Sequence, residues 1–103
     1  MASKQENEAG NHDEINWNVI SYIISSHYRL AVLERLSEGP ATPTRIASDT
    51  EQHVAHISRA LQRLRERDQV DLLVPEDRTK GRVYGLTDEG EESWKTIDEE
   101  ELL

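Results

Sequence analysis

Residues 42–64 constrain the fold more than any other segment, because they carry two short amphipathic helices separated by a tight polar turn. Thr42 can cap the first helix, and Pro43 suits its first position, where the missing N–H has no intrahelical partner to lose. The turn is expected at 49–51. We predict a second helix over 52–68 that packs across the first, as in a helix-turn-helix.

The second helix has two unlike sides when it is drawn as a wheel of about 100° per residue. Its apolar side carries Val54, Ile57, Leu61 and Leu64, with Ala60 at the edge. The opposite side and its flanks carry Gln52, His53, Ala55, His56, Ser58, Arg59, Gln62 and Arg63. Arg can bond bidentately to guanine, Gln to adenine, and Ala can contact the thymine methyl group. The pattern therefore favours a helix that reads bases in the major groove of DNA.

The N-terminal half of a reading helix usually contacts the bases. We therefore expect Gln52, Ala55 and His56, and after them Arg59, to lie against base edges. Arg63 lies further along the helix and is expected to contact a backbone phosphate, which fixes the register without reading sequence. The residues of the preceding helix that we expect at the same interface are Thr44 and Arg45.

A β-hairpin is expected after the second helix, with strands over 70–74 and 82–86 and a polar loop over 75–81. Its basic residues are Arg78, Lys80 and Arg82. A charged hairpin tip beside a helix-turn-helix can reach phosphates or the minor groove. Glu76 and Asp77 offset part of this positive charge.

Three further helices are expected around this centre, which gives an α+β fold that is mostly helical with a two-stranded hairpin. Apolar residues recur at helical spacing from near Ile15 to Ile24, from Tyr28 to Leu36, and up to Ile97. The sequence Glu38-Gly39-Pro40 is a strong stop signal for the second of these helices. The expected caps are, in chain order, Asp13, Ser25 or Ser26, and Thr87 or Asp88.

The order helix, helix, reading helix, hairpin resembles the winged helix-turn-helix domain. The segments Ile57–Leu64, Lys80–Tyr84 and Leu86–Gly90 resemble MarR-like and ArsR-like regulators. The acidic, Lys-poor composition is similar to that of the small winged-helix regulators of halophilic archaea. The resemblance covers about residues 15–97 and implies a homodimeric transcriptional regulator, expected to be a repressor, that binds double-stranded DNA. The wing residues that it implies are Arg78, Lys80 and Arg82.

Charge is distributed unevenly along the chain. The 103 residues have a formal net charge of −9, yet residues 41–85 hold eight of the 12 Lys and Arg and only seven of the 21 Asp and Glu. Residues 86–103 hold eight acidic residues and one basic residue. The middle of the chain is therefore the part that phosphate does not repel. Abundant acid with only three Lys is a composition associated with proteins that work in concentrated salt.

The length predicts one domain, at 14–97, between a disordered tail at 1–13 and an acidic tail at 98–103. The chain has no Cys, which excludes disulfides and thiol catalysis. We find no apolar run long enough to cross a membrane and no apolar signal segment at the start, so we expect a cytoplasmic protein.

A dimer interface is expected from the first and last helices, because both lie outside the helix-turn-helix. Its candidate residues are Trp17, Ile20, Ile24, Trp94 and Ile97. Trp is enriched at protein interfaces, but each of these side chains could equally pack in the core. For a MarR-type dimer stem, the last helix is short.

Neither a catalytic site nor a cofactor is expected, because no sequence pattern pairs a nucleophile with a base and an orienting group. His53 and His56 stand at i and i+3, but no Cys supports them and Glu51 is the only nearby carboxylate, so we expect no metal site. Two alternatives remain open. One is a winged helix that binds proteins of the transcription machinery, which the acidity favours. The other is a ligand- or metal-responsive regulator, although the Cys sites of many ArsR-type sensors are absent.

Overall fold

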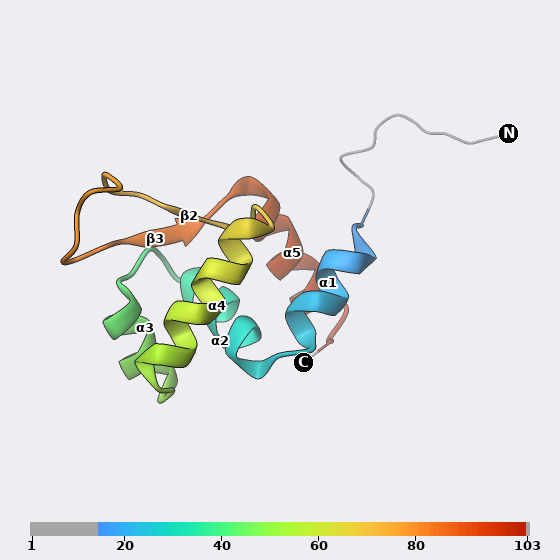
Figure 1. The fold of residues 1–103 in the computed structure, drawn as a ribbon. Coiled ribbons are helices and arrows are strands. Elements are labelled where there is room, and N and C mark those ends of the chain that lie inside the picture. The colour runs from blue at the N-terminus through green and yellow to red at the C-terminus, as the bar shows by residue number, and fades with distance from the viewer. Residues whose placement is uncertain (1–14, 103) are drawn as a thin grey trace, which may run out of the picture.

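The computed structural model describes residues 15–102, which form five helices and one antiparallel hairpin. The elements are α1 (Trp17–Ile24), α2 (His27–Leu36), α3 (Pro43–Thr50), α4 (Val54–Glu66), β2 (Val70–Leu72), β3 (Tyr84–Leu86) and α5 (Asp88–Glu99). Figure 1 shows α3 and α4 beside α2, with the hairpin loop projecting from one end of the molecule and α1 and α5 at the other. The expected winged helix-turn-helix architecture is confirmed, while the tail at 1–13 lies outside the described residues.

Local side-chain caps set most of the helix starts. Asn16 accepts from the N–H of Val19 at 3.3 Å, so α1 begins at Trp17 and not near Ile15. The expected cap, Asp13, lies outside the described residues. Ser26 caps α2, as one of the two residues proposed for this role. These caps satisfy N–H groups that the helices themselves leave free.

The turn between α3 and α4 lies two residues later than expected. Asp49 and Thr50 still belong to α3, and the chain reverses at Glu51, which has a left-handed backbone with φ of 57°. The N–H of Gln52 donates to the carbonyl of Ala47 at 3.0 Å, which closes the end of the helix. This bond and the left-handed residue form a Schellman motif, a position that favours glycine.

The rotation of α4 about its axis is fixed by four buried side chains, Ile57, Ala60, Leu61 and Leu64. They pack against α2 and α3. The helical-wheel prediction was wrong for Val54, the first residue of α4. Val54 was expected on the apolar side, but it is 41% exposed. The helix also begins after its cap, His53, and not at Gln52.

The hairpin is shorter in regular structure than the sequence suggested. β2 and β3 pair in the register Val70↔Leu86 and Leu72↔Tyr84. Beyond them Leu73 adds a single bond to the carbonyl of Val83 before Pro75 begins the loop. On the edge of β3 that faces away from β2, Tyr84 exchanges two hydrogen bonds with Ala41, of 2.9 and 3.0 Å. This bridge ties the base of the hairpin to the segment that leads into α3.

The last helix is held against the segment that follows α4. The N–H of Thr87, the cap of α5, donates to the carbonyl of Gln69 at 3.1 Å, and the buried Gln69 side chain accepts from Ser93 at 2.6 Å. Gly90 is required here, because a Cβ at that position would overlap the main-chain oxygen of Gln69. The helix continues to Glu99, beyond the expected boundary at 97, and Leu102 still packs against the core.

We predict that Glu51→Gly stabilises the protein, because glycine adopts a left-handed backbone without a Cβ penalty. The expected gain is about 0.5–1 kcal/mol in the free energy of unfolding by urea titration. Glu51→Ala is the matched control, since it removes the same charge but keeps a Cβ. Equal stabilities for the two variants would contradict the assignment of strain to this turn.

Candidate nucleic-acid interface

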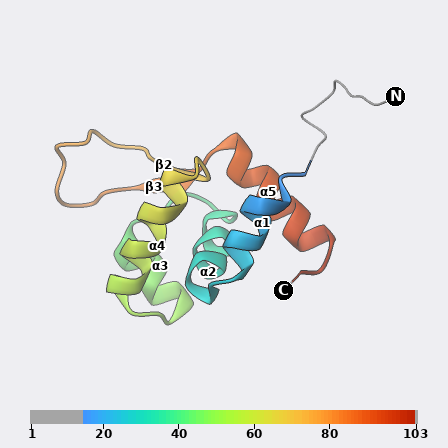
Figure 2. The ribbon, with the colours of Figure 1, turned by 45° about the vertical axis from the view of Figure 1, so that its right-hand side comes forward.

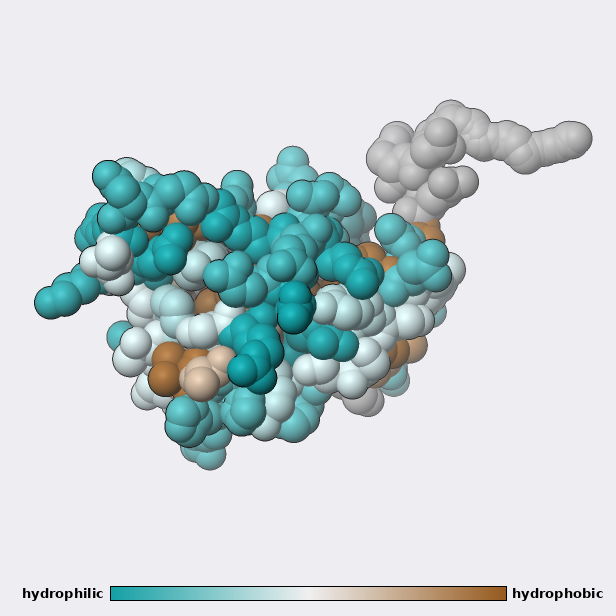
Figure 3. Space-filling model, viewed as in Figure 1, coloured by the Kyte–Doolittle hydropathy of each residue, from teal (hydrophilic) through white to brown (hydrophobic). Residues whose placement is uncertain are grey.

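The face of α4 opposite the core is open to solvent over its whole length. The exposed residues on this face are Ala55, His56, Ser58, Arg59, Gln62 and Arg63, with His53 exposed before them. Gln52 is half-buried and lies in the turn. In Figure 3 the surface over α4 is mostly hydrophilic, with one small apolar patch near its N-terminal end. The residue types that the wheel assigned to this face are thus brought together on one surface.

The two histidines of this face make structural contacts. His53 caps α4, with Nδ1 accepting from the N–H of Ala55 at 3.2 Å. His56 stacks on Tyr28 of α2, with 4.4 Å between ring centroids and 16° between planes. Within residues 15–102 no group of three potential metal ligands is found. The histidine side chains therefore fix the first turn of α4 and its contact with α2.

Three guanidinium groups line one hollow beside α4. This hollow has a volume of 580 Å³ and lies between α4, the start of α3 and β3. Its basic residues are Arg59, Arg63 and Arg82, and its one acidic residue is Glu66. The rest of the lining is uncharged: Pro43, Ala55, Ser58, Leu61, Gln62 and Tyr84. The Nε of Arg82 is buried and has no hydrogen-bond partner among the described residues. A buried donor left unpaired is costly. An anion in the hollow would be attracted by the three guanidinium groups that line it.

Arg82 does not lie at the hairpin tip, where the sequence had placed it. It is half-buried on the arm that returns to β3, which is why it reaches α4. The tip carries the exposed Arg78 and Lys80. The Nε of Arg78 donates to the carbonyl of Lys80 at 2.9 Å, and Gly81 supports the turn with φ of 65°. Figures 1 and 2 show this loop standing clear of the helices.

An ion-pair cluster that sequence analysis missed fastens the hairpin loop to α4. Arg65 of α4 bonds to Glu76 in the loop, and its Nε lies 3.6 Å from Asp71 of β2. The other oxygen of Glu76 lies 3.5 Å from Arg82. The Arg65 guanidinium holds the pKa of Glu76 below its usual range, and Glu76 raises the pKa of Arg65 in return. We call Arg65, Asp71, Glu76 and Arg82 the wing clamp.

Acidic residues restrain other cations of the interface. Asp49 accepts from Arg35 at 2.8 Å and from Arg45 at 3.3 Å, and the hydrogen bond from Arg35 is the main cause of its lowered pKa. Arg63 lies 3.3 Å from Glu66 in an exposed pair, which is weak in water. Thr44 and Arg45 are both exposed on α3.

The residues proposed for a dimer interface divide into two groups. Trp17 and Ile24 are exposed, with Trp17 at 51%. Trp94 is half-buried against the core. Ile20 and Ile97 are 2% and 0% exposed, so they are core residues and offer almost no surface to a partner. Periodicity alone could not separate these groups, because both sides of α1 are apolar.

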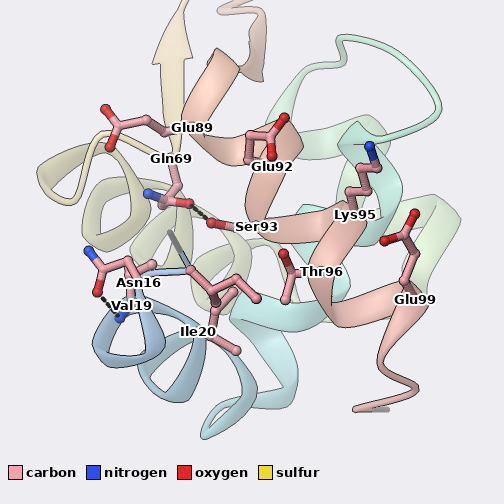
Figure 4. Close-up of a pocket in the computed structure, with 11 residues that line it drawn as sticks. Asn16, Val19, Ile20, Gln69, Glu89, Glu92, Ser93, Lys95, Thr96 and Glu99 are labelled. Carbon is pink, nitrogen blue, oxygen red and sulfur yellow. Dashed lines mark hydrogen bonds between the residues drawn. The ribbon is translucent and has the colours of Figure 1, made fainter. Parts of the chain in front are cut away.

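A second hollow, of 270 Å³, lies between α1 and α5. Figure 4 shows the Ser93–Gln69 hydrogen bond at its wall and Glu92, Lys95 and Glu99 along α5. Its lining is mainly polar and holds three Glu and one Lys.

None of the helices within residues 15–102 is long and apolar enough to span a membrane.

Known structures share this architecture. No family model matches the chain, and no curated protein sequence resembles it closely enough to count as a relative. A MarR family regulator from Neisseria meningitidis superposes with a TM-score of 0.66 at 19% identity, over 90% of this chain and 69% of that chain. The homodimeric winged helix-turn-helix DNA-binding domain of a possible ArsR-family regulator from Mycobacterium bovis gives 0.62 at 18%, over 93% and 92%.

A mutant form of ZitR from Lactococcus lactis has a TM-score of 0.66 at 19% identity, over 75% of this chain. The present chain spans only 53% of that chain's length. These likenesses establish the winged helix-turn-helix fold, shared with regulators of the MarR and ArsR families.

We predict that Glu76→Gln loosens the hairpin loop, because it removes the charge that joins Arg65 and Arg82 while keeping the shape. Heteronuclear ¹H–¹⁵N NOE values over residues 75–82 should fall, with little change in the melting temperature. Acid should have the same effect in the wild type, because a depressed carboxyl pKa means that the clamp holds above the ordinary Glu range and is lost as pH falls through the lowered value. The control is Asp77→Asn in the same loop; equal NOE changes in both variants would contradict the clamp.

Proposed function

We propose that this chain is a homodimeric, sequence-specific DNA-binding transcriptional regulator that reads DNA with α4. The main observation behind this proposal is that two features lie next to each other on one surface. The exposed face of α4 offers side chains that hydrogen-bond to bases, and Arg59, Arg63 and Arg82 converge on the adjacent hollow. The fold shared with MarR and ArsR family regulators supports the same reading.

The chemistry divides between base reading and backbone binding. The first three turns of α4 enter the major groove, where Arg59 can bond to guanine and Gln62 to adenine. A backbone phosphate occupies the hollow and accepts from the guanidinium groups of Arg63 and Arg82, which line it. Arg78 and Lys80 reach the next stretch of backbone or the minor groove. In a dimer, two α4 helices would lie about 34 Å apart, one helical turn of DNA.

The negative net charge of the protein restricts DNA binding to the face made by α4 and the hairpin. α5 carries three acidic residues in its first turn, and none of its residues lines the hollow beside α4. Repulsion of phosphate there leaves the α4 and hairpin face as the favourable approach. The acidic, Lys-poor composition also supports a role in concentrated salt, as in the halophilic archaeal regulators that the sequence resembles. In such salt, counterion release is weakened, so base contacts must carry more of the binding.

The regulator would act in the cytoplasm, by occupying promoters as a repressor. This proposal treats residues 14–97, with α5 extending to Glu99, as the DNA-binding domain and the segments outside it as tails. The exposed Trp17 and Ile24 of α1 supply the proposed dimer contact.

The test of DNA reading starts from duplexes selected from a random library by the purified full chain. Arg59→Ala should weaken binding to a selected duplex by about 5- to 100-fold, because a bidentate contact to a base is lost. Arg63→Ala should weaken selected and unselected duplexes alike, since it binds phosphate. The control is Lys95→Ala on α5, which should bind as the wild type does.

Wild-type affinity in the double variant Arg59→Ala/Arg63→Ala would contradict DNA reading by α4. Loss of a protein partner in that variant, with DNA affinity unchanged, would favour the alternative of a protein-binding winged helix.

Dimerisation through α1 predicts that Trp17→Glu sediments as a monomer while keeping its circular dichroism spectrum, because Trp17 is largely exposed in a single chain. Leu73→Glu is the matched control, since Leu73 is equally exposed but lies in the hairpin and not in α1. A wild-type protein that is monomeric at high concentration, or a Trp17→Glu variant that still dimerises, would refute this interface.

A further inference from the structure

The first turn of α4 carries an apolar patch that the core does not use. Val54 is the first residue of the helix and is 41% exposed, and its neighbour Ala55 is exposed as well. Figure 3 shows a small apolar patch at this end of α4 amid hydrophilic surface. A single exposed apolar residue is ordinary on a protein surface. What matters is its place in the turn that the proposed function puts into the major groove.

The surroundings of the patch identify what it meets. His53 lies before it, and Ser58 and Arg59 follow within the next turn, all exposed. These side chains would hydrogen-bond to base edges and phosphates, and Val54 stands at the N-terminal end of the same helix. In the floor of the major groove, the one apolar group that the four bases present is the C5-methyl of thymine. An isopropyl group placed there gains contact only where a thymine lies.

We propose that Val54, with Ala55, is a specificity-determining residue that selects operator half-sites carrying thymine methyl groups. This rests on the proposed function and deepens it, because it names the base chemistry that the start of α4 accepts. Guanine and adenine contacts belong to Arg59 and Gln62, further along the helix. The thymine contact therefore falls towards the end of the half-site that the N-terminus of α4 enters.

The rigidity of this turn makes a methyl contact selective. His53 caps the helix through Nδ1, and the N–H groups of both His56 and Ile57 donate to the His53 carbonyl at 3.1 Å. Val has a strongly restricted side-chain rotamer in a helix. Val54 therefore loses little freedom when it is placed against a methyl group.

Uracil substitution tests the inference, because uracil differs from thymine only by that methyl group. In a duplex selected by the full chain, each thymine is replaced in turn by uracil and the affinity is measured. We expect one or two positions in each half-site to lose about fourfold in affinity, the effect of removing one buried methyl contact. In Val54→Ala the loss on uracil substitution should largely disappear, as a double-mutant cycle requires.

The matched control is Leu73→Ala, which removes an apolar side chain that is 52% exposed, against 41% for Val54, and should keep the wild-type uracil effect. A wild type that binds every uracil duplex as tightly as its thymine parent would overturn the inference while leaving DNA reading intact. So would an unchanged uracil effect in Val54→Ala. Failure to select any duplex would instead refute the proposed function, and this inference with it.

Discussion

The rotational setting of α4 about its own axis is the constraint on which the other features of this molecule depend. Ile57, Leu61 and Leu64 are at most 1% exposed, so the helix cannot turn without opening the core. Their burial decides that Arg59 and Arg63 point outward together. The same rotational setting places the C-terminal half of α4 against the hairpin. It also places the residues after α4 against the start of α5. A core contact thus determines which chemistry the surface presents.

Two fixed points hold this helix relative to its neighbours. At its start, the left-handed residue Glu51 and the cap His53 close the turn from α3. At its end, Asp68 is also left-handed, and the main chain of Gln69 accepts from Thr87 at the start of α5. Between them the wing clamp joins Arg65 to the hairpin loop. The reading face, the hollow and the hairpin are therefore parts of one framework and not separately placed groups.

The sequence predicted those features that depend on local chemistry. Thr42 and Thr87 act as caps as expected, because a cap needs only its own helix. Periodicity found the buried side of α4 but failed at Val54, since a wheel gives direction and not the extent of the neighbouring helices. The turn shifted because Asp49 is held within α3 by Arg35, fourteen positions away. The clamp between Arg65 and Glu76 was likewise invisible, because it depends on where the base of the hairpin lies relative to α4.

The account's central claim is that the face made by α4 and the returning arm of the hairpin binds DNA. The most direct measurement is an NMR titration of the ¹⁵N-labelled protein with a selected duplex, followed through amide and arginine side-chain signals. We expect the largest shifts on residues 53–63 and 78–82, with the side-chain signals of the exposed Arg59 and Arg63 moving strongly. Shifts confined to α1 and α5, or none at saturating duplex, would contradict it.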